Sequence, residues 1–254
     1  MPKPAPQKSH KPSPADPPVR LADGLDRAAI AARLAERGRV HIPGILRPDC
    51  AARLRDCLER EIAWNATFND GAKVHTLHPV QQAAMSPEQL AIIRNFAHER
   101  ARTGFQFLFR NFPVADVDRA AAGPDLYVFR VFDFLNGPEF LAFAREVTGM
   151  AEIALADCQA TLYQPGDFLT RHTDLGTAQQ KRRAAYVLNM TRDWRTEWGG
   201  LLEFTDAAGH VVEGFCPGFN ALNLFLVPTP HQVSYVAPFA VGGRYSLTGW
   251  LRER

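Results

Sequence analysis

Apolar residues in the second half of the chain fall into short runs that turn-forming residues separate. Runs of this length, rich in β-branched and aromatic residues, predict strands that are buried on at least one face. Several short strands joined by turns are typical of an antiparallel barrel or a jelly roll. The runs with this pattern cover residues 158–163, 168–172, 184–190, 198–204, 220–226, 231–236 and 244–251.

The first half of the chain has a helical spacing of apolar residues instead. Ser86 and Gln89 form a capping box with Pro87 at the first helical position, which predicts the start of a helix. Gly149 is placed to end another helix. The predicted elements are helices over 25–38, 50–62, 86–101 and 137–148, a strand over 39–43, and a hairpin over 64–77 with Asn69-Asp70-Gly71 at its centre.

These elements predict one domain of the α+β class, mainly β, in which N-terminal helices brace one face of the barrel. The domain covers residues 20–254, with a mixed helical support over 20–149 and the stranded core over 150–254. Residues 1–19 hold seven of the nineteen prolines, three lysines and no aromatic residue, which predicts a disordered tail. Such a tail could bind a partner's groove as a polyproline II helix, although an unstructured leader is the simpler interpretation.

Composition narrows the class of partner. At 254 residues with 46% hydrophobic residues, the chain can bury one full core, and a net charge of +2 is too small to indicate nucleic-acid binding. The sequence has neither a secretory signal nor an apolar run of membrane-spanning length, so we expect no membrane partner and a cytoplasmic location. The four cysteines lack metal-type spacing and are expected to be reduced: Cys50, Cys57, Cys158 and Cys216. Cys50 and Cys57 are expected to pack in the core.

Three side chains in the stranded half could form one face of an iron site: His172, Asp174 and His231. A His and an Asp two residues apart on a strand point to the same face, so both can reach one metal ion. A second imidazole from a distant strand completes two histidines and one carboxylate, which leave the other coordination positions open as in non-haem Fe(II) oxygenases. A His-x-Asp pair by itself also arises by chance, as an accidental turn or a hydrogen-bonded pair.

Arg244 starts the last predicted strand, thirteen residues after His231, with Ser246 and Thr248 on its own face by the two-residue period. A guanidinium there can hold a carboxylate through two parallel N–H donors, which a lysine cannot reproduce. Taken alone, Arg244 is as well explained as a surface cation on a strand. Its place after a candidate ligand favours a binding role, and Ser246 joins it as a candidate cofactor-binding residue.

These residues resemble those of the Fe(II)- and 2-oxoglutarate-dependent oxygenases, in their prolyl 4-hydroxylase-like branch. The motifs that carry the resemblance, over residues 150–252, are Tyr163-x-Pro-Gly, His172-Thr-Asp174, Tyr186-Val-Leu-Asn with Asp193-Trp194, Gly199-Gly200, His231, and Arg244-Tyr-Ser with Trp250.

The resemblance implies a double-stranded β-helix, a jelly-roll or cupin-like fold, as the core. It implies Fe(II) bound by His172, Asp174 and His231, with O₂ and 2-oxoglutarate as cosubstrates and the far carboxylate of 2-oxoglutarate on Arg244. By matching position, Tyr163 looks like the residue whose hydroxyl assists that arginine. A tyrosine on a buried strand is also often a core residue with a satisfied hydroxyl.

The function that the resemblance implies is hydroxylation of an unactivated C–H bond by an Fe(II)- and 2-oxoglutarate-dependent dioxygenase. The resemblance favours a prolyl residue in a protein as the substrate. A ribosomal protein is one such candidate, because related ribosomal prolyl hydroxylases share the spacing of nine residues from Tyr163 to His172. A free amino acid or another small metabolite is an alternative substrate. A non-catalytic β-barrel that senses iron or 2-oxoglutarate is an alternative of a different class.

Several other residues have two interpretations at this point. Trp194, Trp198 and the loop over 175–183 could shape the choice of substrate, although both tryptophans could equally be core aromatics. Lys181-Arg-Arg183 is expected to be solvated, yet it borders the entrance and could attract an anionic substrate. His75 and His78 invite a metal site, but three residues apart on an extended segment they face opposite ways.

Overall fold

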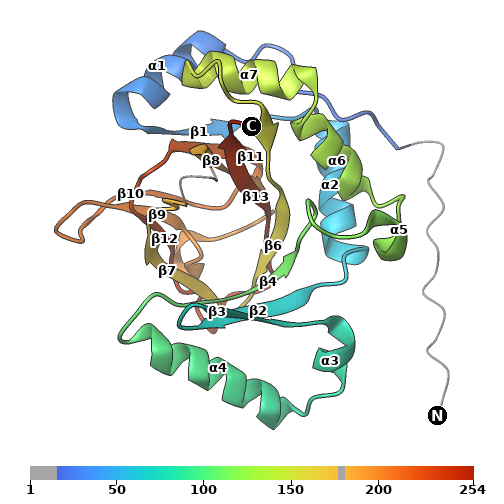
Figure 1. The fold of residues 1–254 in the computed structure, drawn as a ribbon, viewed down its shortest axis with the longest axis vertical. Helices are drawn as coiled ribbons and strands as arrows, with labels where there is room; N and C mark the ends of the chain where they lie inside the picture. The colour runs from blue at the N-terminus through green and yellow to red at the C-terminus, as the bar shows by residue number, and fades with distance from the viewer. Residues whose placement is uncertain (1–15, 177–180) are drawn as a thin grey trace.

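The computed structural model describes residues 16–176 and 181–254 (Figure 1). The strands of the first half are β1 (Arg39–Pro43), β2 (Asn65–Asp70), β3 (Lys73–Leu77) and β4 (Phe107–Phe112). Those of the second half are β5 (Leu155–Ala156), β6 (Gln159–Tyr163), β7 (Phe168–His172), β8 (Arg182–Met190), β9 (Leu202–Thr205), β10 (Val211–Phe215), β11 (Phe219–Leu226), β12 (His231–Val233) and β13 (Arg244–Arg252).

Within the described ranges these strands pair antiparallel in one sheet that curls round on itself (Figure 1). The order along the sheet is β1-β11-β8-β13-β6-β4-β7-β12-β9-β10, with β2 and β3 attached through β4 and with β5 attached to β13. An ion pair between Arg39 and Glu213 links the two end strands, with 2.5 Å between Nε and Oε2. The near-barrel confirms the predicted antiparallel core and the α+β class.

The helices are α1 (Arg27–Arg37), α2 (Pro48–Arg60), α3 (Pro79–Ala83), α4 (Pro87–Ala101), α5 (Arg119–Ala122), α6 (Tyr127–Leu135) and α7 (Pro138–Thr148), with a 3-10 turn at Thr196–Trp198. The caps predicted for two of them are present. The Ser86 hydroxyl accepts a hydrogen bond from the Gln89 N–H at the start of α4, and Gly149 ends α7 with a φ of 69°.

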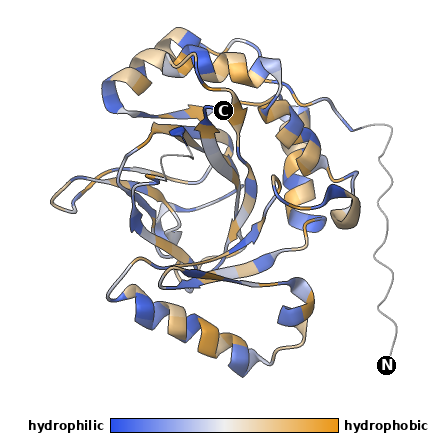
Figure 2. Ribbon diagram, in the orientation of Figure 1, coloured by the Kyte–Doolittle hydropathy of each residue, from blue (hydrophilic) through white to orange (hydrophobic). Residues whose placement is uncertain are grey.

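Two groups of helices cover different sides of the sheet. Helix α1 packs on α7 and α2 packs on α6, and these four share the main core with the inner residues of β8, β11 and β13 (Figure 1). Helix α4 lies at the opposite end, against β2 and β4, where Ala97 packs with Phe68 and Leu108. The prediction that all N-terminal helices brace one face is therefore wrong for α4. Figure 2 shows hydrophilic and hydrophobic residues mixed along α1, α4 and α7.

Several elements have no counterpart among the predicted ones, and α6 and β4 contribute most to the fold. Residues 127–135 are largely aromatic and β-branched, types that favour strands, yet they form α6 because five of their side chains are buried between helices and sheet. Strand β4 lies in the middle of the sheet, between β6 and β7, so the first half contributes to the barrel itself.

The ordered domain begins before the predicted boundary at residue 20. Asp16 accepts a hydrogen bond from Arg53, 2.7 Å between Oδ1 and Nε, and the Pro17 carbonyl accepts one from the Tyr127 hydroxyl at 2.8 Å. The prediction of disorder is therefore wrong for residues 16–19. Residues 1–15 of the predicted tail lie outside the described residues. None of the helices in the described ranges is long and apolar enough to cross a membrane.

Candidate functional site

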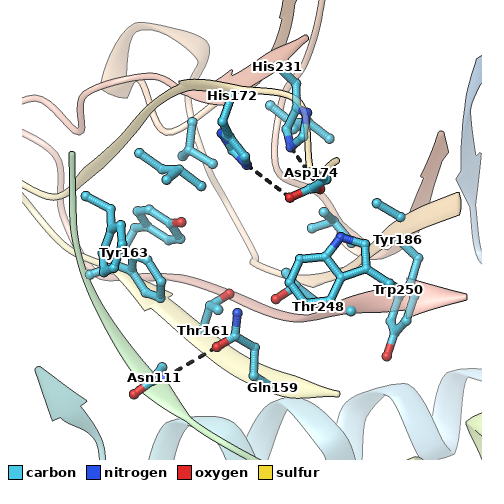
Figure 3. A pocket seen from close by; sticks show the side chains of 18 of the residues that line it. Asn111, Gln159, Thr161, Tyr163, His172, Asp174, Tyr186, His231, Thr248 and Trp250 are labelled. Atoms are coloured by element: carbon cyan, nitrogen blue, oxygen red, sulfur yellow. Dashed lines mark hydrogen bonds and ion pairs between the residues drawn. The ribbon is translucent and has the colours of Figure 1, made fainter. Parts of the chain in front are cut away.

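The three predicted metal ligands meet at one end of the barrel (Figure 3). His172 ends β7 and His231 begins β12, and the two residues are direct cross-strand partners with ring centroids 4.2 Å apart. Asp174 lies between the two rings, with Oδ1 3.3 Å from His172 Nε2 and Oδ2 3.4 Å from His231 Nε2. One ligand atom from each residue lies within 4.8 Å of the other two, so a single ion can contact all three.

The backbone fixes which nitrogen each imidazole presents. His172 Nδ1 lies 3.0 Å from the Thr170 carbonyl oxygen, and His231 Nδ1 lies 2.8 Å from the Thr229 carbonyl oxygen. A carbonyl can only accept, so each Nδ1 carries a proton, which leaves Nε2 as the ring nitrogen that can bind a metal ion. Such outer hydrogen bonds orient metal-binding histidines. Two Nε2 atoms and a carboxylate form the donor set that suits non-haem iron.

Asp174 reaches this position by a different route from the one predicted. Strand β7 ends at His172, and Asp174 has a φ of 57°, in the left-handed region that an aspartate tolerates better than most residues. The expectation that both ligands share one strand face is therefore wrong. Burial by itself raises the pKa of the Asp174 carboxyl, but the two imidazoles facing it hold that pKa well below its usual range. The carboxylate is ionised and available as a ligand.

A buried turn sets the spacing between β6 and β7. Gln164 N–H donates to Asp167 Oδ2 at 2.8 Å, Arg110 Nη1 lies 3.2 Å from the same oxygen, and Gly166 takes a φ of 95°. Burial raises the pKa of Asp167 to about 6, and Arg110 opposes that rise. The Pro-Gly-Asp sequence that predicts a turn thus fixes where Tyr163 leaves one strand and where His172 ends the next.

Arg244 is 1% exposed, which makes it one of the most deeply buried charged side chains described. It starts β13 opposite Tyr163 on β6, and its Cζ lies 4.9 Å from the centroid of the Tyr163 ring. Within the described ranges it makes no ion pair, and its Nε has no hydrogen-bond partner. Burial lowers the pKa of Arg244, as expected for a cation removed from water without an anion beside it. Such a cation fits an anionic ligand.

The other two predicted cofactor-binding residues differ from expectation. Tyr163 lines the same pocket as Arg244, but it offers the face of its ring to the guanidinium, and its other neighbour is the stacked ring of Phe109 at 5.1 Å. Burial raises the pKa of the Tyr163 hydroxyl, so it stays protonated. Ser246 is fully buried, and its hydroxyl pairs with that of Thr161 at 2.8 Å. It does not line the pocket.

The triad and Arg244 open into one pocket of about 570 Å³ (Figure 3). Figure 3 shows the triad on one side of the pocket and a polar group on the opposite side, from Asn111, Gln159, Thr161 and Thr248. Much of the remaining wall was missed by the sequence analysis because it comes from β4 and the β2–β3 hairpin. The alternation of aromatic residues along β4 was the available signal. These wall residues are Thr67, Val74, Phe105, Phe107, Phe109 and Asn111.

The structure decides between the two interpretations of the tryptophans and of the histidines at positions 75 and 78. Trp194 and Trp198 are core aromatics: they pack edge to face at 5.3 Å, outside the pocket lining, and Trp194 Nε1 donates to the Gly199 carbonyl at 2.8 Å. His75 stacks on Phe68, and His78 bonds Asn65, so neither belongs to a metal-ligand group among the residues described.

The described residues of the segment 175–183 have different surroundings. Leu175 and Arg182 line the pocket, Lys181 and Arg183 point to the surface, and positions 177–180 lie outside the described residues.

Residues 158–252 match the model of the 2OG-Fe(II) oxygenase superfamily. The prolyl 3-hydroxylase OGFOD1 of Mus musculus is 29% identical over 119 residues, which is 44% of this chain and 21% of that protein. The matched region thus spans about a fifth of the length of this curated relative.

Three solved structures have a similar fold. An oxidoreductase of the 2OG-Fe(II) oxygenase family from Burkholderia pseudomallei superposes with a TM-score of 0.57 at 18% identity, over 91% of this chain and 92% of that one. A Pseudomonas putida prolyl-4-hydroxylase gives 0.51 at 22%, over 90% and 99%. A Trichoplax adhaerens prolyl hydroxylase, in complex with a peptide fragment of hypoxia inducible factor, gives 0.55 at 15%, over 89% of each chain.

Proposed function

Residues 158–252 belong to the 2OG-Fe(II) oxygenase superfamily, and from that premise we propose that this protein hydroxylates a prolyl residue in a protein substrate. Its cofactors are those of the superfamily, Fe(II) and 2-oxoglutarate, with O₂ as the oxidant. The observation that carries the oxygenase assignment is the triad of His172, Asp174 and His231, which presents three metal ligands on one side and an open pocket on the other.

The donor set fits the metal that the family uses. His172 and His231 would bind the iron through Nε2, since their Nδ1 atoms are committed to backbone carbonyls, and Asp174 would supply one carboxylate oxygen. When bound, the iron and 2-oxoglutarate supply the oxidative chemistry, in which O₂ is reduced, 2-oxoglutarate is converted to succinate and CO₂, and one oxygen atom enters the substrate C–H bond.

Arg244 would bind the far carboxylate of 2-oxoglutarate. Its burial and its unpartnered Nε mean that an anion there gains a charge-assisted contact without displacing an existing ion pair. The Tyr163 ring holds the guanidinium in place from one side, which limits the angles at which a carboxylate can approach. A bound cosubstrate would then exclude water from this end of the pocket.

Support for a protein substrate comes from the mouth of the pocket. Three large apolar side chains that line it are also exposed: Val74 at 58%, Phe105 at 49% and Leu175 at 71%. An apolar rim around a polar interior suits a chain that is bound along its length, whereas a small metabolite is usually enclosed. Phe107 and Phe109 continue the apolar surface inward, where a pyrrolidine ring could pack. The named prolyl hydroxylases above support the same choice.

The test is turnover with defined substrates. Protein supplied with Fe(II), 2-oxoglutarate and O₂ is incubated with proline-containing peptides, including ribosomal protein segments, and separately with free amino acids. Mass spectrometry then detects the addition of one oxygen atom, and succinate is measured in parallel, with Asp174→Ala as the inactive control. Hydroxylation of free amino acids alone would reject the protein substrate and keep the oxygenase. Absence of succinate under every condition would instead favour the iron- or 2-oxoglutarate-sensing barrel.

A further inference from the structure

Arg182 begins β8 at the end of the pocket that Asp174 occupies. Its guanidinium stacks on the indole of Trp250, with 3.5 Å between Cζ and the ring centroid, and both side chains line the pocket. One donor is already used, because Nη1 lies 3.2 Å from the backbone carbonyl oxygen of Asp174. The side chain is therefore held flat against an aromatic wall, beside the proposed metal site.

Arg182 forms no ion pair within the described parts of the chain, although both of its neighbours in sequence are paired. The carboxylates of Asp174 and Asp157 attract its guanidinium without pairing with it. Lys181 lies 3.7 Å from Glu253, and Arg183 forms ion pairs with Glu253 and Glu152. Alternation along β8 turns Arg183 outward and Arg182 inward, and Lys181 precedes the strand with an exposed side chain. The basic run is thus two ion-paired surface residues and one cation directed into the pocket.

Two buried hydrogen-bond donors at this end also lack an acceptor. Arg182 Nε and Trp250 Nε1 are both removed from solvent, and neither has a hydrogen-bond partner among the described residues. Buried donors of this kind are rare in folded proteins, and each one calls for a specific explanation. Two of them on stacked side chains, one of which is a guanidinium without an ion-pair partner among the described residues, indicate a place for a ligand with acceptor oxygens.

This end is distinct from the cosubstrate end. Arg244 and Trp250 stand six residues apart on β13, which corresponds to about 20 Å along a strand. Figure 3 shows Tyr163, the ring under Arg244, on one side of the pocket and Trp250 on the other, next to Asp174. The pocket therefore has a cation at each end, with the triad near the second.

We propose that Arg182, stacked on Trp250, recognises a carboxylate of the substrate. This inference rests on the proposed function, in which 2-oxoglutarate occupies Arg244 and leaves Arg182 to the substrate. In a protein substrate the carboxylate is an Asp or Glu side chain near the hydroxylated residue. In a small substrate it is the molecule's own carboxylate. The chemistry is the same in both cases, and matched probes separate the two sources.

The rival role for Arg182 is to position Asp174, whose carbonyl it contacts and whose backbone has a positive φ. A positioning role predicts that loss of Arg182 weakens iron binding for every substrate alike. Carboxylate recognition predicts that iron binding persists and that only acidic substrates lose affinity. Arg182→Gln keeps a donor for the Asp174 carbonyl and removes the charge, so it distinguishes the two roles.

Binding is measured by calorimetry on the full chain with Fe(II) and 2-oxoglutarate under anaerobic conditions, so that no turnover occurs. The first probes are proline-containing peptides with one Glu moved through the positions around the proline, each matched with the same peptide carrying Gln. The second probes are N-acetyl-L-proline and its neutral amide. Arg183→Gln is the matched control, because it removes a charge from the outward face of the same strand.

We expect wild-type protein to prefer one carboxylate probe over its neutral partner, and Arg182→Gln to lose about tenfold in affinity for that probe and less than about twofold for the neutral one. Arg182→Lys should recover only part of the loss, because a lysine lacks the planar fork and the stacking. A preference confined to the Glu peptides identifies an acidic side chain as the source, and one confined to N-acetyl-L-proline identifies a free carboxylate.

Two results would overturn the inference. One is a wild-type protein that binds no carboxylate probe more tightly than its neutral partner. The other is an Arg182→Gln variant that binds less iron but still binds the carboxylate probe more tightly than its neutral partner. Failure of the proposed function looks different: the carboxylate preference would depend on Arg182, yet no probe would gain oxygen when O₂ is admitted.

Discussion

The two halves of the chain contribute differently to one pocket. The second half supplies the triad and Arg244 from strands that match the oxygenase superfamily, and each of these groups is buried or fixed by backbone contacts. The first half supplies the β2–β3 hairpin, β4 and the segment before β4, whose pocket residues include Val74 and Phe105 at the exposed rim. The metal triad and Arg244 therefore come from one half of the chain, and much of the apolar pocket wall comes from the other.

This difference predicts that changes in the two halves act on different measured quantities. Substitutions in the second half should change metal or cosubstrate binding, while those at the first-half rim should change substrate binding alone. Arg182 is the informative exception, since it belongs to the second half and faces the substrate end.

The largest effect is expected for His231→Ala. The variant leaves one imidazole and one carboxylate, which is too few protein ligands to retain Fe(II) at equimolar concentration. Iron loading, measured by metal analysis after anaerobic reconstitution and desalting, should be abolished. His210→Ala is the matched control, because His210 is exposed and lies outside the triad. If His231→Ala binds iron as tightly as the parent protein, the triad assignment is wrong.

Arg244→Lys should weaken 2-oxoglutarate binding by at least about tenfold, because the ammonium keeps the charge but loses the two parallel donors. Iron binding should be nearly unchanged, since Arg244 contacts none of the three ligands. Calorimetric titration of 2-oxoglutarate into the iron-loaded protein measures the effect. Arg192→Lys is the control, because Arg192 stacks on Phe219 away from the pocket. An unaltered affinity in Arg244→Lys would remove Arg244 from the cosubstrate site.

The triad could be predicted from the sequence because metal chemistry restricts the residue types, and the turn at Pro165-Gly166 marks where the strands end. The route of Asp174 could not, since spacing alone assumes a regular strand and the observed φ is positive. Arg182 was only one of three consecutive basic residues. The strand pairing of β8 decides which of them faces inward, and that pairing is a long-range property.

The first half was less predictable for a related reason. The residues of α6 favour a strand locally, and burial against α2 and the sheet overrides that preference. Strand β4 is recognisable as an apolar run, but only its pairing with β6 and β7 brings Phe109 and Asn111 into the pocket. The local sequence pattern therefore predicted the elements that have their own periodicity or capping residues. It could not predict contacts between strands that are distant in the sequence.

Truncation of the N-terminus tests the support that the first half gives to the fold. Deleting residues 1–15 should leave the melting temperature and turnover unchanged, because their composition predicts no buried contact. Deleting residues 1–19 also removes the Asp16–Arg53 ion pair and the Pro17–Tyr127 hydrogen bond. That loss should cost about 2 kcal/mol, or about 4 to 8 °C in melting temperature. Scanning calorimetry of both truncations measures the difference, and equal melting temperatures would contradict it.

The smallest effect is expected at the rim. Val74→Ser removes part of an exposed apolar contact at the mouth of the pocket without touching the triad or Arg244. A peptide that packs on Val74 should lose about 1 kcal/mol of binding, which raises its KM about fivefold while leaving the 2-oxoglutarate affinity unchanged. Val80→Ser is the matched control, because Val80 is 82% exposed and does not line the pocket. Equal KM values in the two variants would mean that the substrate does not reach the rim. They would favour a small enclosed substrate over a protein one, with the oxygenase chemistry of the second half unaffected.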